Sequence, residues 1–178
     1  MSRLRPAVSK ADHTAGPDDA PVTLVEYGDF ECPHCMRAHP IVHELRRRMA
    51  GSLRFVFRHF PLEHSHPHAR HAAEAAEAAA AHGKFWEMHD TLFAHQKHLE
   101  DEDLASYGTE VGIDPNEIRQ ALSAHTYASA VEEDFSSGAR SGVNGTPTFF
   151  INGTRVDGPW DLQSLFDDLQ EAMPARRR

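Results

Sequence analysis

Residues 22–35 read Val-Thr-Leu-Val-Glu-Tyr-Gly-Asp-Phe-Glu-Cys-Pro-His-Cys. The β-branched and apolar run Val22–Tyr27 predicts a short strand, and apolar residues after Cys32 recur at helical spacing as far as Gly51. The pair Cys32 and Cys35 therefore falls where a strand turns into a helix. This strand–turn–helix unit around two cysteines guides the interpretation of the rest of the chain.

The position of the cysteines predicts their chemistry. At a helix start, free backbone N–H groups and the positive end of the helix dipole favour a thiolate, so the pKa of Cys32 should fall below the usual ~8.5. His34 can add positive charge or a hydrogen bond, and Pro33 suits a helix opening because no N–H is needed there. Cys35 lies one turn further on, within reach of a disulfide. We therefore expect Cys32 to attack and Cys35 to resolve.

Other interpretations of the pair stay open. The chain has 2 cysteines and 14 histidines, so Cys32 and Cys35 could hold zinc together with two further ligands. Two inert core cysteines are a further alternative, as is a thioredoxin-like module that only binds a partner. Such a binding module would leave the two thiols without a difference in reactivity.

Two other positions fit a redox site. Alternation along the first strand places Glu26 on a largely buried face under the helix start, where its raised pKa would let it accept a proton from Cys35. An edge-facing, solvated glutamate is the alternative. Thr146-Pro147 precedes a later strand, and Pro147 is a candidate for a cis peptide bond, although the residues alone favour an ordinary trans proline.

The remaining pattern gives an ordered series of elements. Leu53–Phe60 predicts a second strand that pairs in parallel with the first, and residues 61–142 read as helical. Thr148–Ile151 and residues 154–156, joined by Asn152-Gly153, predict an antiparallel hairpin. A closing amphipathic helix over 162–169 ends the series, which runs β-α-β, helices, β-β-α.

Three motifs together resemble the DsbA-like thiol–disulfide oxidoreductases. They are residues 25–35 around the cysteine pair, the run Phe-Trp-Glu-Met-His at 85–89, and Gly-Thr-Pro-Thr-Phe-Phe-Ile-Asn-Gly at 145–153. The resemblance covers about residues 20–170. It implies an α/β thioredoxin fold with an inserted all-helical subdomain.

The resemblance also implies domain boundaries and roles for site residues. The thioredoxin-fold domain would comprise residues 21–61 and 143–174, with a helical insertion over 62–142 and a flexible lead-in over 1–20. Pro147 would be cis and lie against the cysteine pair, and Thr146 would contact substrate backbone. The Cys-Pro-His-Cys motif matches strongly oxidising members, whereas threonine before the proline matches isomerase and reductase branches, so the net direction stays open.

Composition limits the function further. The chain has 178 residues, 40% of them hydrophobic, and 18 basic against 27 acidic side chains give a net charge of −9. Such a charge disfavours binding to nucleic acid, and no apolar run is long enough to span a membrane. The chain starts without an export signal, which predicts a cytoplasmic protein. We also expect a monomer.

We expect protein or small-molecule thiol and disulfide substrates, and an unidentified redox partner. The exchange needs no organic cofactor or metal, because the sulfur atoms themselves carry the electrons. Four histidines cluster between residues 64 and 71 and are expected to be solvated, with weak metal binding as the alternative. These are His64, His66, His68 and His71.

Overall fold

A computed structural model describes residues 2–174 of the protein. Its centre is a five-stranded sheet with the strand order β1-β3-β2-β4-β5. The strands are β1 (His13–Ala15), β2 (Val22–Gly28), β3 (Leu53–His59), β4 (Thr148–Ile151) and β5 (Thr154–Arg155). The helices are α1 (Pro33–Arg48), α2 (Ala69–Ala80), α3 (Phe85–Ala94), α4 (Asp101–Val111), α5 (Pro115–Ser123), α6 (Ala128–Arg140) and α7 (Leu162–Glu171).

The strand pairing agrees with the predicted β-α-β and β-β-α units. β2 is parallel to β3 and antiparallel to β4, and β4 pairs antiparallel with β5. The turn between β4 and β5 uses positive φ angles of 47° at Asn152 and 80° at Gly153, as a tight hairpin requires. The predicted α/β thioredoxin fold is thus present.

Alternation along β2 separates two buried layers. Val22 and Leu24 belong to the cluster that contains the inner faces of α1 and α7, whereas Val25 and Tyr27 belong to a second cluster on the opposite face. Because both faces are covered, the central strands β2 and β3 are buried along nearly their whole length. Glu26 has the same parity as Leu24, so the alternation directs a carboxylate under α1.

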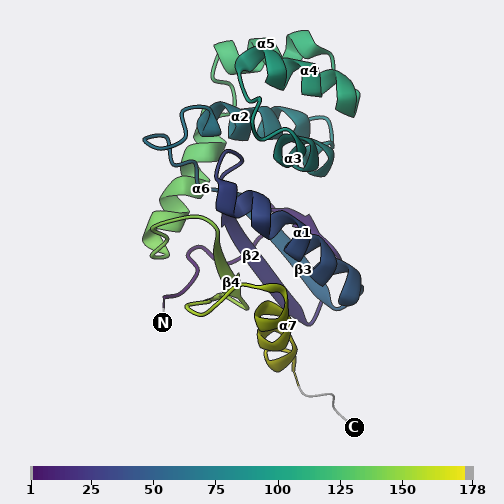
Figure 1. Ribbon diagram of the computed structural model, residues 1–178, viewed down its shortest axis with the longest axis vertical. Coiled ribbons are helices and arrows are strands. Elements are labelled where there is room, and N and C mark those ends of the chain that lie inside the picture. Colours follow the sequence, from purple (N-terminus) through teal and green to yellow (C-terminus); the bar gives the residue numbers. More distant parts are fainter. Residues whose placement is uncertain (1, 175–178) are drawn as a thin grey trace.

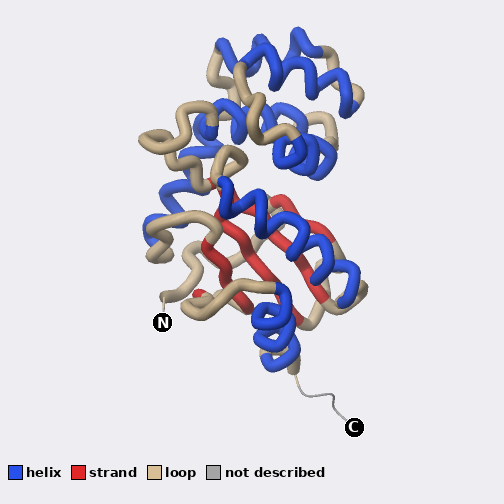
Figure 2. The backbone as a smooth tube through the Cα atoms, in the orientation of Figure 1, coloured by secondary structure: helices blue, strands red, loops and turns tan. Residues whose placement is uncertain are grey.

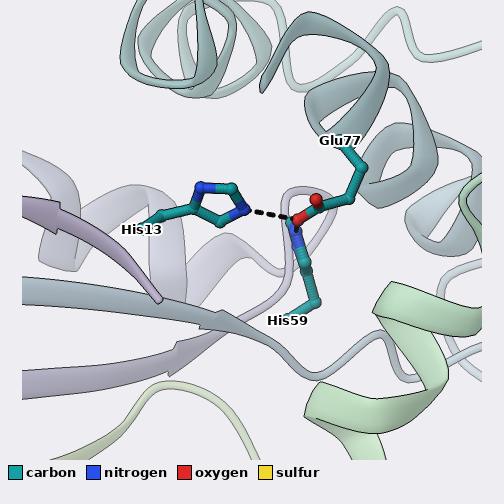
Figure 3. Close-up of side chains that lie close together, drawn as sticks. All are labelled: His13, His59 and Glu77. Atoms are coloured by element: carbon teal, nitrogen blue, oxygen red, sulfur yellow. Dashed lines mark hydrogen bonds and ion pairs between the residues drawn. The ribbon is translucent and has the colours of Figure 1, made fainter. Parts of the chain in front are cut away.

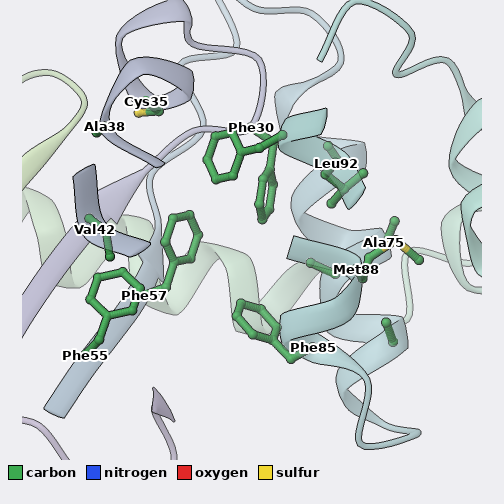
Figure 4. Close-up of a cluster of buried hydrophobic side chains, with 14 of the residues drawn as sticks. Phe30, Cys35, Ala38, Val42, Phe55, Phe57, Ala75, Phe85, Met88 and Leu92 are labelled. Atoms are coloured by element: carbon green, nitrogen blue, oxygen red, sulfur yellow. The ribbon is translucent and has the colours of Figure 1, made fainter. Parts of the chain in front are cut away.

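The helices α2 to α5 form a group at one end of the molecule, beyond the first turn of α1 (Figures 1 and 2). Aromatic and aliphatic side chains fill the junction between this group and the sheet, among them Phe30, Phe57, Phe85 and Met88 (Figure 4). Cys35 lies at the edge of the same cluster (Figure 4). The cysteine pair therefore sits where the sheet, α1 and the helical group meet.

The helix α6 crosses the sheet on the face opposite α1. A Cβ atom added at Gly138 would lie 2.7 Å from the ring of Phe60 and 3.0 Å from that of Tyr27. Only glycine allows this close approach. The ring of Phe135, one turn earlier on α6, stacks on Phe60 with the ring centroids 4.4 Å apart.

The start of the chain differs from expectation, because residues 1–20 read as a flexible lead-in. In the structure Leu4 is buried, and β1 pairs antiparallel with β3 at the edge of the sheet. The guanidinium of Arg58 donates hydrogen bonds to both carboxylate oxygens of Asp12, at 2.7 and 3.1 Å, and both side chains are largely buried. Backbone pairing and one buried ion pair hold this segment. Because neither contact requires a periodic pattern of apolar residues, the sequence does not indicate that the segment is ordered.

Candidate active site

Cys32 is the N-cap residue of α1, with extended backbone angles, and Pro33 occupies the first turn. Cys32 is 3% exposed and Cys35 is fully buried, and both are free thiols in this structure. Pro33 and His34 are exposed between them. The local pattern of a strand, a turn and a proline-initiated helix thus places the pair where the sequence predicts it.

The surroundings of Cys32 favour its thiolate. A hydrogen bond with Cys35 contributes most to lowering the pKa of Cys32, to about 4; burial opposes the shift, and the Thr146 side chain and the backbone N–H groups of Cys35 and His34 add to it. These N–H groups are free because they belong to the first turn of α1. The thiolate is the nucleophilic form, so Cys32 has the electrostatics of an attacking thiol at neutral pH.

The surroundings of Cys35 have the opposite effect. Burial raises the pKa of Cys35 well above its ordinary value, and the hydrogen bond with Cys32 and the charge of Glu26 raise it further. The backbone N–H of Asp29 donates a hydrogen bond to Cys35 Sγ at 3.4 Å and partly offsets this shift. At neutral pH the pair therefore consists of one thiolate and one protonated thiol.

Glu26 lies where the strand alternation predicts, 2% exposed beneath the start of α1. Burial, with a smaller contribution from the charge of Cys32, raises the pKa of Glu26 to about 8. Its Oε1 atom is buried and has no hydrogen-bond partner. A carboxyl that is protonated near neutral pH and coupled to both thiols can donate or accept a proton as they change state.

Thr146 and Pro147 come from a distant part of the chain to the same place. The peptide bond between them is cis. The carbonyl oxygen of Thr146 lies 3.5 Å from Cys32 Sγ and accepts a hydrogen bond from it when Cys32 is protonated. The loop before β4 thus forms one wall of the site.

The side chain of His34 does not have the expected role of adding a charge or a hydrogen bond to the Cys32 thiolate. Its imidazole is exposed, and its Nδ1 atom accepts a hydrogen bond from the Arg37 guanidinium at 2.7 Å. The contribution of His34 to the Cys32 thiolate comes from its backbone N–H. The structure therefore brings Cys32, Cys35, Glu26 and Thr146 together, while the His34 side chain points to solvent.

Sequence reasoning missed Gln96, which follows α3. Its side-chain amide donates hydrogen bonds to the carbonyl oxygens of Phe30 and Cys32, both at 2.9 Å. Gln96 thereby ties the loop before α1 to the helical group. A single glutamine in a polar segment carries no signal of this role, because the contact exists only after the two parts of the chain meet.

The two acids beside the cysteine pair, Asp29 and Glu31, hold neighbouring segments through hydrogen bonds. Asp29 is 2% exposed and accepts hydrogen bonds from the backbone N–H groups of Glu31 and Leu62 and from the His66 ring. Burial outweighs these hydrogen bonds and raises the pKa of Asp29. Glu31 in turn accepts hydrogen bonds from the backbone and the ring of His68.

The histidines at 64–71 therefore do not converge on one point. The rings of His66, His68 and His71 contact three different acids, Asp29, Glu31 and Asp101. Within residues 2–174, the groups of side chains arranged like metal ligands lie elsewhere and contain neither cysteine. Weak metal binding, the alternative to the expected solvation of this cluster, thus has no geometric support.

A second buried polar group links β1, β3 and α2. Glu77 Oε1 accepts hydrogen bonds from Nε2 of His13 at 2.6 Å and Nε2 of His59 at 2.7 Å (Figure 3). Burial lowers the pKa of His59, but the hydrogen bond and charge of Glu77 outweigh it and raise that pKa overall. The same two histidines hold the pKa of Glu77 well below its ordinary value, against the effect of burial.

The family model described as "Thioredoxin" matches residues 8–171. The chain belongs to the thioredoxin family. This family member is similar to the oxidised BdbD of Bacillus subtilis, with a TM-score of 0.87 and 25% identity over 96% of this chain and 97% of that one. It is also similar to a thioredoxin-like oxidoreductase from Silicibacter pomeroyi, with a TM-score of 0.81 and 26% identity over 92% and 93% of the two chains.

The thiol–disulfide exchange protein alpha-DsbA2 from Wolbachia pipientis shares the fold, with a TM-score of 0.79 and 22% identity over 92% of this chain and 88% of that one. The predicted thioredoxin fold is thereby confirmed, and so is the predicted resemblance to DsbA-like proteins, which are among the structural neighbours.

The curated relatives are longer proteins. The thioredoxin-family chain is 45% identical over 166 residues to a protein of Salinispora tropica named Na(+)/H(+) antiporter NhaA 3, which covers 93% of this chain and 25% of that protein. A protein of Mycolicibacterium vanbaalenii named Na(+)/H(+) antiporter NhaA 1 is 46% identical over 172 residues, which is 96% of this chain and 28% of that protein. The chain thus spans about a quarter of these relatives.

This finding corrects the expected location. The prediction of a cytoplasmic protein rested on the absence of an export signal at Met1, and it is wrong. In the relatives the matching segment is a minor part of proteins named as antiporters, so the first residues of this chain do not indicate its compartment. Among residues 2–174, the helices are too short or too polar for one of them to cross a membrane.

Proposed function

We propose that the chain is a thiol–disulfide oxidoreductase that exchanges disulfides with protein or small-molecule thiols through Cys32 and Cys35. The observation that carries this proposal is the opposite shift of two neighbouring thiols, with the pKa of Cys32 lowered to about 4 and that of Cys35 raised well above 9.0. Structural pairs of cysteines have no need of such a difference. An attacking and a resolving thiol do need it.

The exchange can be written with the residues present. In the oxidised protein a substrate thiolate attacks Cys32 Sγ, the Cys32–Cys35 bond breaks, and Cys35 leaves as a thiolate that takes up a proton. A second substrate thiolate then attacks the substrate sulfur of this mixed disulfide and releases Cys32 as a thiolate. The substrate loses two electrons as a disulfide forms in it, and the protein gains them.

Glu26 is proposed to handle the proton of Cys35. With its pKa raised to about 8, the carboxyl is protonated at pH 7 and can supply a proton as the Cys35 thiolate forms. In the reverse direction the carboxylate accepts the proton when Cys35 attacks the mixed disulfide. Burial keeps bulk water from doing this freely, so a dedicated acid–base group has a clear use.

Thr146 and Pro147 are proposed to receive the substrate. The Thr146 carbonyl lies beside Cys32 Sγ, so a peptide that reacts with Cys32 must pass along this loop. Backbone groups there can pair with an extended peptide whatever its side chains, which suits varied protein substrates.

The proposed direction is net oxidation of substrate thiols. A Cys32 thiolate with a pKa of about 4 stabilises the reduced protein, and a stabilised reduced form makes the disulfide a stronger oxidant.

The site is built from one chain, so we propose a monomer. A separate redox partner must then remove the two electrons after each turnover. The proposal does not extend to the antiporter activity in the relatives' names, because the match covers about a quarter of their length.

Two variants with the same chemical change test the proposal. Cys32→Ser should abolish exchange with a model disulfide, whereas Cys35→Ser should still react once and accumulate a mixed disulfide, detected by mass spectrometry. Exchange by Cys32→Ser at the wild-type rate would refute the proposal. Stoichiometric zinc bound through unreactive thiols would instead support the metal-binding alternative.

A further inference from the structure

We propose that His39, His43 and Asp90 form a binding site for a divalent transition-metal ion such as Zn²⁺, distinct from the cysteine pair. His39 and His43 are four residues apart on α1, so both rings lie on one face of this helix. Asp90 approaches them from α3. The inference does not depend on the proposed redox function.

The three side chains converge on one point. The Nε2 atom of His39 lies 2.9 Å from Asp90 Oδ1, and the Nε2 atom of His43 lies 3.3 Å from the same oxygen. The three ligand atoms all lie within 4.8 Å of one another. Around a tetrahedral zinc ion with bonds of about 2.0–2.2 Å, ligand atoms lie about 3.3 Å apart. The His43 position already fits this value, and His39 needs a shift of a few tenths of an ångström.

The ligand types suit zinc and similar ions. Two imidazoles and a carboxylate are borderline ligands that bind Zn²⁺, Ni²⁺ or Cu²⁺ in preference to Mg²⁺ or Ca²⁺. The site lines an open pocket of about 620 Å³, and His43 and Asp90 are 46% and 44% exposed, so an ion has access from solvent. Three protein ligands leave a fourth position for water.

Neighbouring groups support rather than oppose a bound cation. The buried ring of His89 donates a hydrogen bond from Nδ1 to Asp90 Oδ1 at 2.9 Å, which fixes the orientation of the carboxylate. The positively charged Arg47 also lines the pocket, but its guanidinium makes two hydrogen bonds, at 2.8 and 2.7 Å, to the carboxylate of Glu44. Its charge is therefore neutralised locally.

The group of His13, His59 and Glu77 is a weaker candidate. Both ring nitrogens lie within 2.7 Å of one carboxylate oxygen, which is the spacing of hydrogen bonds and too short for ligands around an ion (Figure 3). His59 is 1% exposed and packed among aromatic rings, so it cannot move to open the group. The side chains of His39 and His43 are 21% and 46% exposed, so they are less confined than that of His59.

The position of the site gives a bound ion a structural effect. α1 begins at the cysteine pair, and α3 belongs to the helical group, so an ion held by His39, His43 and Asp90 joins the two parts of the fold. Because such an ion binds the folded chain and not the separated ligands, it stabilises the folded state. The site would thus act as a clamp beside the candidate active site.

The test uses metal-free protein whose cysteines are oxidised to the disulfide, so that the thiols cannot bind zinc. Titration with ZnCl₂ by calorimetry should show one ion per chain, together with a rise in melting temperature. His43→Gln should weaken this binding by about tenfold or more, and Asp90→Asn should do the same. His64→Gln is the matched control, because His64 is exposed and lies outside both groups, and it should bind zinc as wild type does.

The outcomes separate a built site from chance binding by a histidine-rich chain. Equal affinity of His43→Gln and His64→Gln would overturn the proposal, as would the absence of saturable binding in wild type. Loss of the ion in His13→Gln but not in His43→Gln would place it in the other group and would also overturn it. Unchanged circular dichroism and melting of the metal-free variants show that they fold, and His39→Gln provides a second variant of the same site.

Discussion

The redox potential of the Cys32–Cys35 pair follows from the pKa difference, and equilibration with glutathione buffers at pH 7 measures it. With a pKa of about 4, Cys32 is almost fully ionised at pH 7. The attacking thiol of a thioredoxin with a pKa of ~7 is half ionised. Relative to that reference, ionisation of Cys32 raises the equilibrium constant for reduction of the disulfide by a factor of about 500. This factor corresponds to ~3.7 kcal/mol of added stability of the reduced form.

This free energy converts to a potential. For a two-electron couple ~1.4 kcal/mol corresponds to ~30 mV, so the gain is ~80 mV above the ~−270 mV of thioredoxin. We therefore expect a potential of about −190 mV. Between the pKa of Cys32 and that of Cys35, reduction takes up one proton for two electrons, so the potential should fall by ~30 mV per pH unit.

The assay traps thiols with acid and an alkylating reagent after equilibration, and mass spectrometry counts them. Titration of the thiolate absorbance gives the pKa of Cys32 independently, and in Cys35→Ala this pKa should rise because its largest stabilising hydrogen bond is removed. A potential at or below that of thioredoxin, with the pKa of Cys32 still near 4, would refute the reasoning.

The remaining tests concern Glu26, Gln96 and the His59–Glu77 pair. Glu26→Gln keeps the size of the side chain but removes its titratable carboxyl group. In stopped-flow assays the rate at which mixed disulfides resolve should therefore fall by about 100-fold, and its pH profile should lose the inflection near pH 8. Gln96→Ala removes two hydrogen bonds and should lower the free energy of unfolding by about 1–3 kcal/mol in urea, while far-UV circular dichroism stays unchanged. The raised pKa of His59 contributes stability that is complete below pH 6.5 and is lost as the pH rises through the folded value. The lowered pKa of Glu77 contributes stability above pH 4.5. Glu77→Gln should therefore lower the free energy of unfolding by about 3 kcal/mol, and this decrease should be largest between pH 4.5 and 6.5. A decrease that grows above pH 8 would contradict this assignment.

Local patterns carried the prediction of the fold and of the cysteine pair. The strand before Cys32 and the proline-initiated helix after it are written in adjacent residues, and the Asn152-Gly153 turn is equally local. Alternation within one strand was enough to place Glu26 under α1. In these cases the physical determinant lies within a few residues of the element.

Contacts between distant segments could not be predicted. Gln96, the buried Asp29 and the pairing of β1 depend on parts of the chain that meet only in the folded protein. The Arg58–Asp12 ion pair joins residues 46 positions apart, and neither residue type signals burial. Sequence alone therefore predicts the position of the cysteine pair at a helix start, but not the distant contacts that hold this loop.

The alanine-rich helix α2 has a consequence for how the molecule opens. Its small buried side chains let it pack against α3, α4, α5 and α6, so it is the shared neighbour of the whole helical group. Loss of α2 would release these helices together and with them the Gln96 contacts to the cysteine loop. Protection of the α2 amides from hydrogen exchange and redox activity should therefore be lost in the same cooperative opening. A partly opened form that retains redox activity should not be populated.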